Sequence, residues 1–534
     1  MGPNERLNSI DEDSAAVQQD RATAALPEPA ASRLLRATAA LPVLLAACVF
    51  IVHDVGYMVR QTFWVDEAWV AVTTRYPLGR LPDVTSSTPI GWSLLLRLFP
   101  GGGQDSRLLP LLFAAGAVAA GYAFGRGLGW GDDWLAVGAG VLTGVAVLMA
   151  PAMLVRNDLK QYTADACMAL LVLVATSRLE RQWTRTQLGV LAGTVAGGML
   201  FSHTTAFVGV LAFAGVGLVH VARRGWRRVV ECVVAGGVAL VAMGVIYELA
   251  DARAVVPGLT SYWRAYYVPI GRGLSASWHF LYTRTDSVAP YVGLGPVWIW
   301  LLLDLAGLAT LVWVGRPMTA TTLALLVPEV IAISAARKYP LFSVRASAFL
   351  LVLGTVLAAV AVAGLCALLR RRSAMAAIAL AGFAAALFVA GNAHYARAHT
   401  IPDQNVRAQS DFVATHRGPS DVILVNLGSN WGFGYYWRQD RMSRTHDPNV
   451  LQGYVVAFPN QPRIVVAAKR DAAGVRAALT TAAIRARRLG AGRIWLIRTN
   501  VNSGEAAAWR AAFQAQRLLA APLGPPGLTV IAVN

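Results

Sequence analysis

The stretch RASAFLLVLGTVLAAVAVAGLCALLRRR, residues 345–372, decides the fold of this chain. Between Arg345 and Arg370 it contains 24 residues without a charge, which as a helix are enough to cross a hydrocarbon layer about 30 Å thick. The arginines at its end mark the cytoplasmic side, because Lys and Arg concentrate in the cytoplasmic loops of membrane proteins. The stretch therefore predicts a membrane-spanning helix that begins on the outer side.

Apolar stretches of this kind recur along most of the chain. Hydrophobic residues make up 56% of its 534 residues, charged residues only 14%, and the mean hydropathy is +0.50. These values exclude a single soluble globule. We predict a polytopic α-helical membrane protein with about eleven spans. They lie at 37–59, 107–128, 134–150, 163–178, 187–200, 206–222, 229–250, 291–315, 318–335, 345–369 and 374–391.

The arginines orient all of these spans in one sense. With the amino terminus inside, every inner connection carries arginine, as the positive-inside rule requires of short loops. These arginines are Arg33, Arg36, Arg126, Arg178, Arg181, Arg185, Arg223, Arg224, Arg227, Arg228, Arg316 and Arg370 to Arg372. The polar clusters then all lie on the outer face. Basic residues on that face need an explanation, and a bound phosphate supplies one.

The two ends of the chain differ from the part between them. Residues 1–33 are rich in Ala, Asp, Glu and Gln without an apolar period, which predicts a disordered cytoplasmic lead before a membrane domain at 34–395. From 396 to 534 β-branched runs and helical patterns predict a small extracytoplasmic α/β domain. Its predicted strands are 421–426, 463–468, 493–500 and 528–534, and its predicted helices are 473–488 and 503–518.

Charge and cysteine content set further limits. The net charge of +18 does not indicate nucleic acid binding, because much of it is arginine at inner loop ends that face anionic lipid. The four cysteines, Cys48, Cys167, Cys232 and Cys366, all lie in predicted spans and are interpreted as small buried apolar residues. No His or Cys cluster has the spacing of a metal site. We expect no required cofactor, and the sequence leaves a divalent metal open.

Two adjacent acids, Asp66 and Glu67, follow the first span in the sequence FWVDEAWV. The tryptophans on both sides predict that a helix over 63–76 lies along the membrane surface. A carboxyl group held there is partly desolvated, which raises its pKa towards values useful for a general base. The alternative is an interfacial helix with a solvated acidic face.

The link RNDLKQYTAD, residues 156–165, is a second polar cluster on the outer side. If it is helical, Asp158, Tyr162 and Asp165 share one face. Such a face would present two carboxylates and a phenol together. The alternative is that Thr163 caps the following span and Asp165 complements its helix dipole.

Cations on the outer face predict a phosphate site. The chain has only three lysines, and two of them, Lys160 and Lys338, lie on this face. Lys338 stands between Arg337 and Tyr339, shortly before Arg345 at the entry to the tenth span. These cations can neutralise a phosphodiester, for which arginine offers a planar bidentate grip. The alternative is ordinary contact with lipid headgroups.

Two other outer residues allow two interpretations each. His203, after the fifth span, is either a proton carrier or a structural histidine. Arg264 lies in the loop 251–290, which is dense in aromatic residues. That loop either stacks on a sugar or anchors the chain at the membrane interface.

Two acids lie inside predicted spans, Asp304 near the middle and Glu329 nearer the outer side. A carboxyl group in the membrane suggests function, because an unpaired charge there is costly. We expect Glu329 to pair with an outer arginine such as Arg345, and Asp304 to be protonated. Both acids also keep a transporter in consideration.

Several stretches, in their order and sidedness, resemble the GT-C superfamily of glycosyltransferases, in particular the bacterial relatives of the protein O-mannosyltransferase and lipid A aminoarabinose transferase group. The pair Asp66-Glu67 resembles the acidic motif of the family's first outer loop. The other similar stretches are STPIGWSLLLRLFP (87–100), DSRLLPLLFAAGAVAAGYAFGRGLG (105–129), RNDLKQYTADACMALLVLVA (156–175) and ARKYPLFSVRASAFLLVL (336–353). The chain departs from the family at Thr88-Pro89-Ile90, where members often have His-Pro-Pro or Lys-Pro-Pro. The contact of that basic residue is therefore not carried over.

The resemblance implies an inverting membrane glycosyltransferase that moves a sugar from a polyprenyl-phosphate donor to an extracytoplasmic acceptor, namely a cell-envelope glycan, a lipid or a protein. A carboxylate, preferably Asp66, would take the proton of the acceptor hydroxyl. Glu67 would stand beside it, and Asp158 would orient the acceptor or share the base role. The donor phosphate would be held by Lys160, Arg337, Lys338, Tyr339 and Arg345, and the substrates by Tyr162, Arg264 and His203.

Two alternatives remain open. One is a transporter or flippase of lipid-linked sugars that uses Asp304 and Glu329, and the other is a non-catalytic membrane scaffold that presents the tail domain. The first outer loop favours the transferase, because a transporter has little use for paired acids on an interfacial helix. In each case the expected location is the cell membrane, with multiple spans.

Overall fold

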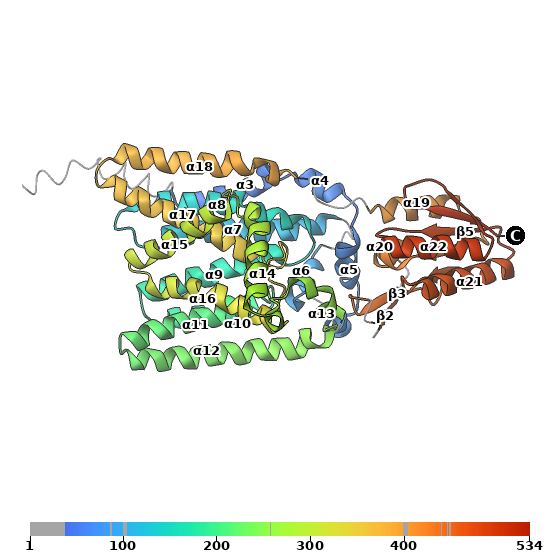
Figure 1. Cartoon of the computed structure of the whole chain (residues 1–534), viewed down its shortest axis with the longest axis horizontal. Helices are drawn as coiled ribbons and strands as arrows, with labels where there is room; N and C mark the ends of the chain where they lie inside the picture. The colour runs from blue at the N-terminus through green and yellow to red at the C-terminus, as the bar shows by residue number, and fades with distance from the viewer. Residues whose placement is uncertain are drawn as a thin grey trace, which may run out of the picture.

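The computed structural model describes residues 38–85, 88–99, 104–256, 258–398, 404–438, 441–445, 447 and 450–533. The predicted disordered lead at 1–33 lies outside these residues. A bundle of long helices forms one end of the molecule, and a strand-containing domain forms the other, with short helices between them (Figure 1).

Each of the eleven predicted spans coincides with a helix. They are α3 Leu41–Val52, α7 Leu108–Arg126, α8 Asp133–Met149, α9 Tyr162–Arg181, α10 Arg185–Gly198, α11 Thr205–Ala222, α12 Trp226–Ile246, α15 Val297–Trp313, α16 Pro317–Ala335, α17 Ala348–Arg370 and α18 Ala374–Ala396. Within the described residues, seven helices are long and apolar enough to cross a membrane, and α3, α8 and α15 are shorter apolar helices. The predicted polytopic helical fold is thus confirmed.

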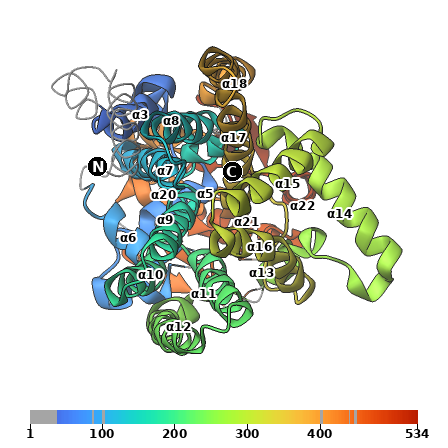
Figure 2. The ribbon, with the colours of Figure 1, turned by 90° about the vertical axis from the view of Figure 1, so that its left-hand side faces the viewer.

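Helix α17 lies inside the bundle, whereas α12 and α18 lie at its rim (Figure 2). Most of α17 is buried, and on α15 Gly307 lets the two backbones approach, since a side chain there would collide with the Leu357 carbonyl of α17. The rim helices instead expose valines and leucines, as expected for helices that face hydrocarbon. Because α17 begins only at Ala348, Arg345 lies in the turns before it.

Short helices cover the end of the bundle that carries the predicted outer loops. The helix predicted over 63–76 is present as the shorter α5 Val65–Thr73, and a second short helix, α6 Ile90–Leu96, packs near it. The link before α9 is a 3₁₀ helix, η3 Pro151–Asn157. The long aromatic loop contains helices that were not predicted, among them α13 Gly258–Tyr262 and α14 Leu274–Val288, and the π-helix η4 Tyr247–Asp251 leads into it.

The carboxyl-terminal part contains a five-stranded sheet in the order β4-β1-β5-β7-β6. The parallel strands β1 Val422–Val425, β4 Ile464–Val466 and β5 Arg493–Ile497 place Leu424 between Val465 and Leu496. The strands β7 Thr529–Ala532 and β6 Leu519–Pro522 continue the sheet in antiparallel pairs. The helices of this part are α19 Val406–His416, α20 Leu427–Trp437, α21 Ala472–Arg488 and α22 Ser503–Ala515.

All four predicted strands and both predicted helices of this part are present. Four features of this part were not predicted: α19, α20, β6 and the hairpin of β2 Arg441–Arg444 and β3 Tyr454–Ala457. This hairpin lies apart from the main sheet and beside the short outer helices (Figure 1).

One apolar core joins the surface helices to the carboxyl-terminal domain. Side chains from both parts pack in it, among them Phe63, Trp64, Trp69, Trp92, Trp431, Phe433 and Tyr454. The Tyr436 hydroxyl accepts a hydrogen bond from the Phe63 amide at 2.9 Å, and the Tyr454 hydroxyl donates one to the Trp69 carbonyl. Large buried aromatics contribute strongly to such packing. Helix α5 is therefore held between the membrane bundle and the carboxyl-terminal domain.

Candidate active site

The first turn of α5 holds the two predicted acids in different surroundings. Glu67 points into the protein, where its carboxylate accepts hydrogen bonds from Arg107 Nε at 2.7 Å and Nη2 at 2.5 Å. Both side chains are 0% exposed, and Arg107 also donates to the carbonyls of Met58, Gln61 and Thr62. Burial raises the pKa of Glu67 to about 7, and the Arg107 guanidinium opposes this rise. Glu67 therefore fixes the start of α5 and does not line a cavity.

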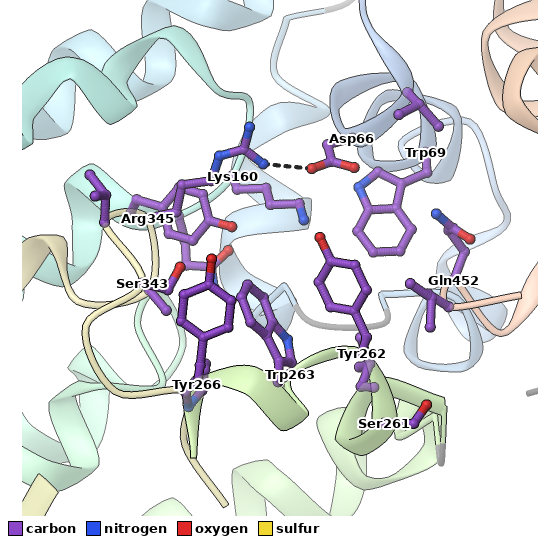
Figure 3. A pocket seen from close by; sticks show the side chains of 18 of the residues that line it. Asp66, Trp69, Lys160, Ser261, Tyr262, Trp263, Tyr266, Ser343, Arg345 and Gln452 are labelled. Atoms are coloured by element: carbon purple, nitrogen blue, oxygen red, sulfur yellow. Dashed lines mark hydrogen bonds and ion pairs between the residues drawn. The ribbon is translucent and has the colours of Figure 1, made fainter. Parts of the chain in front are cut away.

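Asp66 lies on the open side of the same turn. Its Oδ2 accepts a hydrogen bond from Arg345 Nη1 at 2.7 Å (Figure 3). The same Nη1 lies 3.8 Å from Asp158 Oδ2, and the Arg345 guanidinium lies 4.5 Å above the Trp64 ring. One arginine thus bridges two carboxylates that come from separate outer loops. The side chains of Asp66 and Arg345 remain 24% and 41% exposed, so both are accessible from the cavity.

Asp158 lies behind Arg345, at the end of η3. Its side chain is buried, and neither carboxylate oxygen has a hydrogen-bond partner within the described residues. Burial raises the pKa of Asp158, whereas Arg345 and Lys160 lower it. An incompletely paired carboxylate in this position makes the surroundings of Arg345 strongly negative, which favours a positive charge there.

Lys160 supplies a second cation to the same cavity. Its Nζ lies 4.3 Å from the centroid of the Trp69 ring, an attractive arrangement for a cation over an aromatic face. The Trp69 indole N–H is buried and has no hydrogen-bond partner in the described part of the chain. An unused donor and a cation therefore stand together beside Asp66.

A cavity of about 1200 Å³ connects these groups with the carboxyl-terminal domain. Tyr262, Trp263 and Tyr266 form an aromatic wall opposite Asp66 (Figure 3). The predicted site residues that line the cavity are Asp66, Lys160, Tyr162, His203, Lys338, Tyr339 and Arg345. Those that do not line it are Glu67, Asp158, Arg264 and Arg337, and the last two are exposed. Spacing in the sequence could not separate these two sets.

Residues 156–165 do not form one helix, so that expectation is wrong. Asp158 has extended backbone angles, and α9 begins only at Tyr162. Thr163 does not cap the span either, because it lies in the first turn of α9 and Gln161 stands at the cap. Asp165 does lie in that first turn, as the alternative expected.

Two further predicted groups have defined partners. His203 Nε2 lies 3.1 Å from Asp251 Oδ2, and His203 lines the cavity. The Tyr339 hydroxyl donates to the Ala346 carbonyl at 2.5 Å, and burial raises the pKa of that hydroxyl. Tyr339 therefore fixes the turn that carries Arg345, and its ring lines the cavity.

The acids inside the bundle are separate from this site. Asp304 accepts a hydrogen bond from Trp300 Nε1 at 2.8 Å. The predicted pair of Glu329 with Arg345 is wrong, because Arg345 binds Asp66 instead. Among the described residues, Glu329 Oε2 has no hydrogen-bond partner, and neither acid lines the large cavity.

The carboxyl-terminal domain supplies a part of the cavity wall that was not predicted from the sequence. Its lining residues are Leu427, Trp431, Leu451, Gln452, Lys469, Arg470, Asp471, Asn500 and Asn502. Most of them directly follow β1, β4 or β5, and loops at the carboxyl ends of parallel strands are the usual binding edge of such sheets. Their position just after predicted strands could have indicated from the sequence that they belong to a binding site. The described residues contain no group of three or more His, Cys, Asp or Glu side chains able to hold a metal ion.

The whole architecture matches that of solved membrane proteins. ArnT from Cupriavidus metallidurans in the apo state aligns with a TM-score of 0.53 and 15% identity, covering 94% of this chain and 98% of ArnT. ArnT bound to undecaprenyl phosphate aligns with a TM-score of 0.54 and 14% identity, covering 92% and 97%. The GT-C fold expected from the resemblance is thereby confirmed. No protein-family model matches the sequence, and a comparison with curated proteins finds no match.

Proposed function

We propose that this protein is a membrane glycosyltransferase that transfers a sugar from polyprenyl phosphate to an acceptor hydroxyl, with inversion at the anomeric carbon. The observation that carries the proposal is the pair of Asp66 and Arg345 at a cavity large enough for a sugar phosphate and an acceptor. The shared fold with a protein solved with undecaprenyl phosphate supports the choice of donor.

In this mechanism Asp66 is the general base. Its carboxylate takes the proton from the acceptor hydroxyl as that oxygen forms a bond to the anomeric carbon. The bond from this carbon to the phosphate oxygen breaks, and its electron pair stays on polyprenyl phosphate. The cations that line the cavity, Lys160, Lys338 and Arg345, stabilise the charge that develops there.

Arg345 links donor binding to the base. In the structure it donates to Asp66, and a donor phosphate would compete for the same guanidinium. A phosphate that binds Arg345 releases the Asp66 oxygen for the acceptor proton. Asp158, buried behind Arg345, then keeps the arginine in place as a positioning residue.

No metal is assigned a step in this mechanism. The place between Asp66 and Asp158, where a divalent ion could bridge two carboxylates, is filled by the Arg345 guanidinium. We therefore expect transfer to persist after treatment with a chelator. Loss of transfer that Mg²⁺ or Mn²⁺ restores would contradict this part of the proposal.

Neither alternative function is favoured by a contact in the site. A transporter would rely on Asp304 and Glu329, and these acids do not line the cavity of the described structure. A scaffold that only presents the carboxyl-terminal domain would not require a buried cation, Lys160, in the same cavity as an accessible carboxylate, Asp66. The transferase accounts for both features.

The proposed sidedness places the cavity and the carboxyl-terminal domain outside the cytoplasm. Arg370 lies at the opposite end of α17 from Arg345, in keeping with the positive-inside rule. A reporter fused after Asn534 should be active outside, and one fused after Arg372 should be active inside. The same location for both reporters would overturn the orientation.

The function is tested with purified protein in lipid nanodiscs. The protein is incubated with a panel of polyprenyl-phosphate sugars, and the released polyprenyl phosphate is measured by mass spectrometry. At least one donor should release its lipid, and Asp66→Asn should abolish most of this release. Asp286→Asn serves as the control, since Asp286 is an exposed acid on α14 outside the cavity lining.

A further inference from the structure

The sheet of the carboxyl-terminal domain directs its binding edge at the candidate active site. Residues that follow its three parallel strands line the cavity: Leu427 after β1, Lys469 after β4 and Asn500 after β5. The chain passes from β1 to β4 on one side and then crosses back over β1 to β5 on the other, so the direction of the connections reverses at β1. In open α/β sheets, ligands bind outside the carboxyl ends of the strands at such a point.

The cationic side chains at this edge form ion pairs with neighbouring carboxylates. Lys469 Nζ lies 3.6 Å from Asp447 Oδ2, and Arg470 Nη1 lies 3.7 Å from Glu505 Oε2. Asp471 accepts a hydrogen bond from the Gly474 amide at 2.7 Å and so caps α21. Each cation of this edge already has a carboxylate partner. The edge therefore favours a neutral ligand over an anionic one.

Two side-chain amides of the carboxyl-terminal domain are free to bind such a ligand, that of Asn500 after β5 and that of Gln452 just before β3. Gln452 and Asn500 line the cavity, and neither side chain forms a hydrogen bond with another residue of the described structure. An amide offers donors and an acceptor together, which matches hydroxyl groups that also do both. Figure 3 shows Gln452 on the same side of the cavity as Trp69, with Tyr262 near it.

An aromatic wall faces these amides. Tyr262 is 57% exposed and, with Trp263, lines the cavity between Gln452 and Arg345. Exposed aromatic faces beside hydrogen-bonding groups suit the apolar faces and hydroxyl edges of sugar rings. The combination of free amides, paired charges and aromatic faces is that of a carbohydrate subsite.

We propose that the cavity end formed by Gln452, Asn500 and Tyr262 is an acceptor subsite that binds a neutral sugar unit of a glycan. This inference rests on the proposed function and specifies its acceptor. A lipid donor reaches Asp66 from the bilayer, so the acceptor enters from the side that the carboxyl-terminal domain covers. The acceptor is then a glycan chain, whose hydroxyl group reaches Asp66 while a neighbouring unit lies against the sheet edge.

Binding is tested first, because it does not depend on turnover. The probes are neutral hexasaccharides of the gluco, galacto, manno and arabino series, mixed with the full-length protein in nanodiscs and followed by saturation-transfer NMR. At least one probe should bind. A Gln452→Ala and Asn500→Gly double variant should lose most of that signal, at least fivefold. Glycine suits position 500, because Asn500 has a φ of +50°.

A matched control separates the subsite from general effects of asparagine loss. Asn460 is exposed before the amino end of β4, at the opposite edge of the sheet, so Asn460→Gly should bind the probes as the unmodified protein does. Equal signals in the double variant and the unmodified protein would overturn the proposal. So would the absence of binding for all four hexasaccharides.

Turnover then distinguishes this proposal from the proposed function. The hexasaccharide that binds should accelerate polyprenyl phosphate release, and the double variant should raise the KM for that hexasaccharide about tenfold. Acceleration by an anionic lipid or a peptide alone would overturn the neutral-glycan assignment. If no donor releases its lipid while hexasaccharide binding persists and is lost in the double variant, the transferase proposal fails and the subsite stands.

Discussion

Two neighbouring residues of α5 form arginine–carboxylate pairs with opposite surroundings. Glu67 and Arg107 are closed off from solvent, and Arg107 is further bound by three carbonyls. Asp66 and Arg345 face the cavity and are partly exposed. An arginine and a carboxylate therefore stabilise the fold on one side of the helix and form an accessible site on the other.

The two roles differ because the pairs differ in solvent exposure and in the number of hydrogen-bond partners of the arginine, and not because the residue types differ. Removing one partner of a buried pair leaves an uncompensated charge in the interior, which costs stability. Removing Asp66 from the open pair leaves Arg345 partly exposed and still beside Asp158, which costs little stability. Activity and stability should therefore respond in opposite ways to changes at the two pairs.

The largest effect is expected at Asp66. Asp66→Asn keeps the size of the side chain and removes its ability to take a proton, so turnover should fall by about 10²-fold to 10⁴-fold. The midpoint of thermal unfolding should stay close to that of the unmodified protein. Both are measured on one preparation, by polyprenyl phosphate release and by differential scanning fluorimetry. Unchanged turnover would show that the open pair is not the base.

Substitution of Arg107 should lower the free energy of unfolding strongly, in contrast to substitution of Asp66. Arg107→Ala leaves Glu67 buried without its partner, which should cost about 3–5 kcal/mol of folding free energy. We expect a poorly folded protein with a strongly lowered unfolding midpoint. Asp66→Asn is the comparison, and its midpoint should change little because Asp66 is partly exposed and Arg345 keeps Asp158 beside it. Similar midpoints in both variants would remove the distinction between the closed and the open pair.

The sequence predicted most of the membrane fold and only part of the site. Long apolar runs that end in arginine mark spans such as α17 without any tertiary information, because the bilayer itself sets their length. Asp66 and Glu67 look alike in sequence, since only the fold brings Arg107 to one and Arg345 to the other. The same holds for Asn500, whose place in the cavity depends on how the carboxyl-terminal domain packs on α5.

Substitution of Arg345 should have an intermediate effect, and the quantity it changes should be the affinity for the donor. Arg345→Ala should weaken binding of a polyprenyl-phosphate sugar about tenfold to a hundredfold, because a hydrogen bond to a charged group contributes about 1.5–3 kcal/mol. Arg345→Lys should recover only part of the affinity, since the bidentate fork is lost. Donor titrations by fluorescence quenching measure both variants. Arg264→Ala is the control, because Arg264 is exposed and does not line the cavity.

The result that would contradict this role is full recovery by lysine. An arginine that only anchors the chain to lipid headgroups needs its charge and not its shape, so Arg345→Lys would then behave as the unmodified protein. A loss of donor affinity in Arg264→Ala equal to that in Arg345→Ala would move the phosphate site away from Asp66.

The smallest effect is the contribution of Glu67, in the closed pair, to the pH dependence of stability. Burial raises the pKa of Glu67 to about 7 from its ordinary value of 4.5, so the folded protein holds this proton more tightly than the unfolded chain. Stability should therefore fall as pH rises from about 4.5 to about 7 and then level off. Glu67→Gln removes this titration, so its unfolding midpoint should lose roughly 1 to 3 °C less than that of the unmodified protein between pH 5 and pH 7.5. Identical slopes in Glu67→Gln and the unmodified protein would show that the Glu67 carboxylate stays ionised across this range under the control of Arg107.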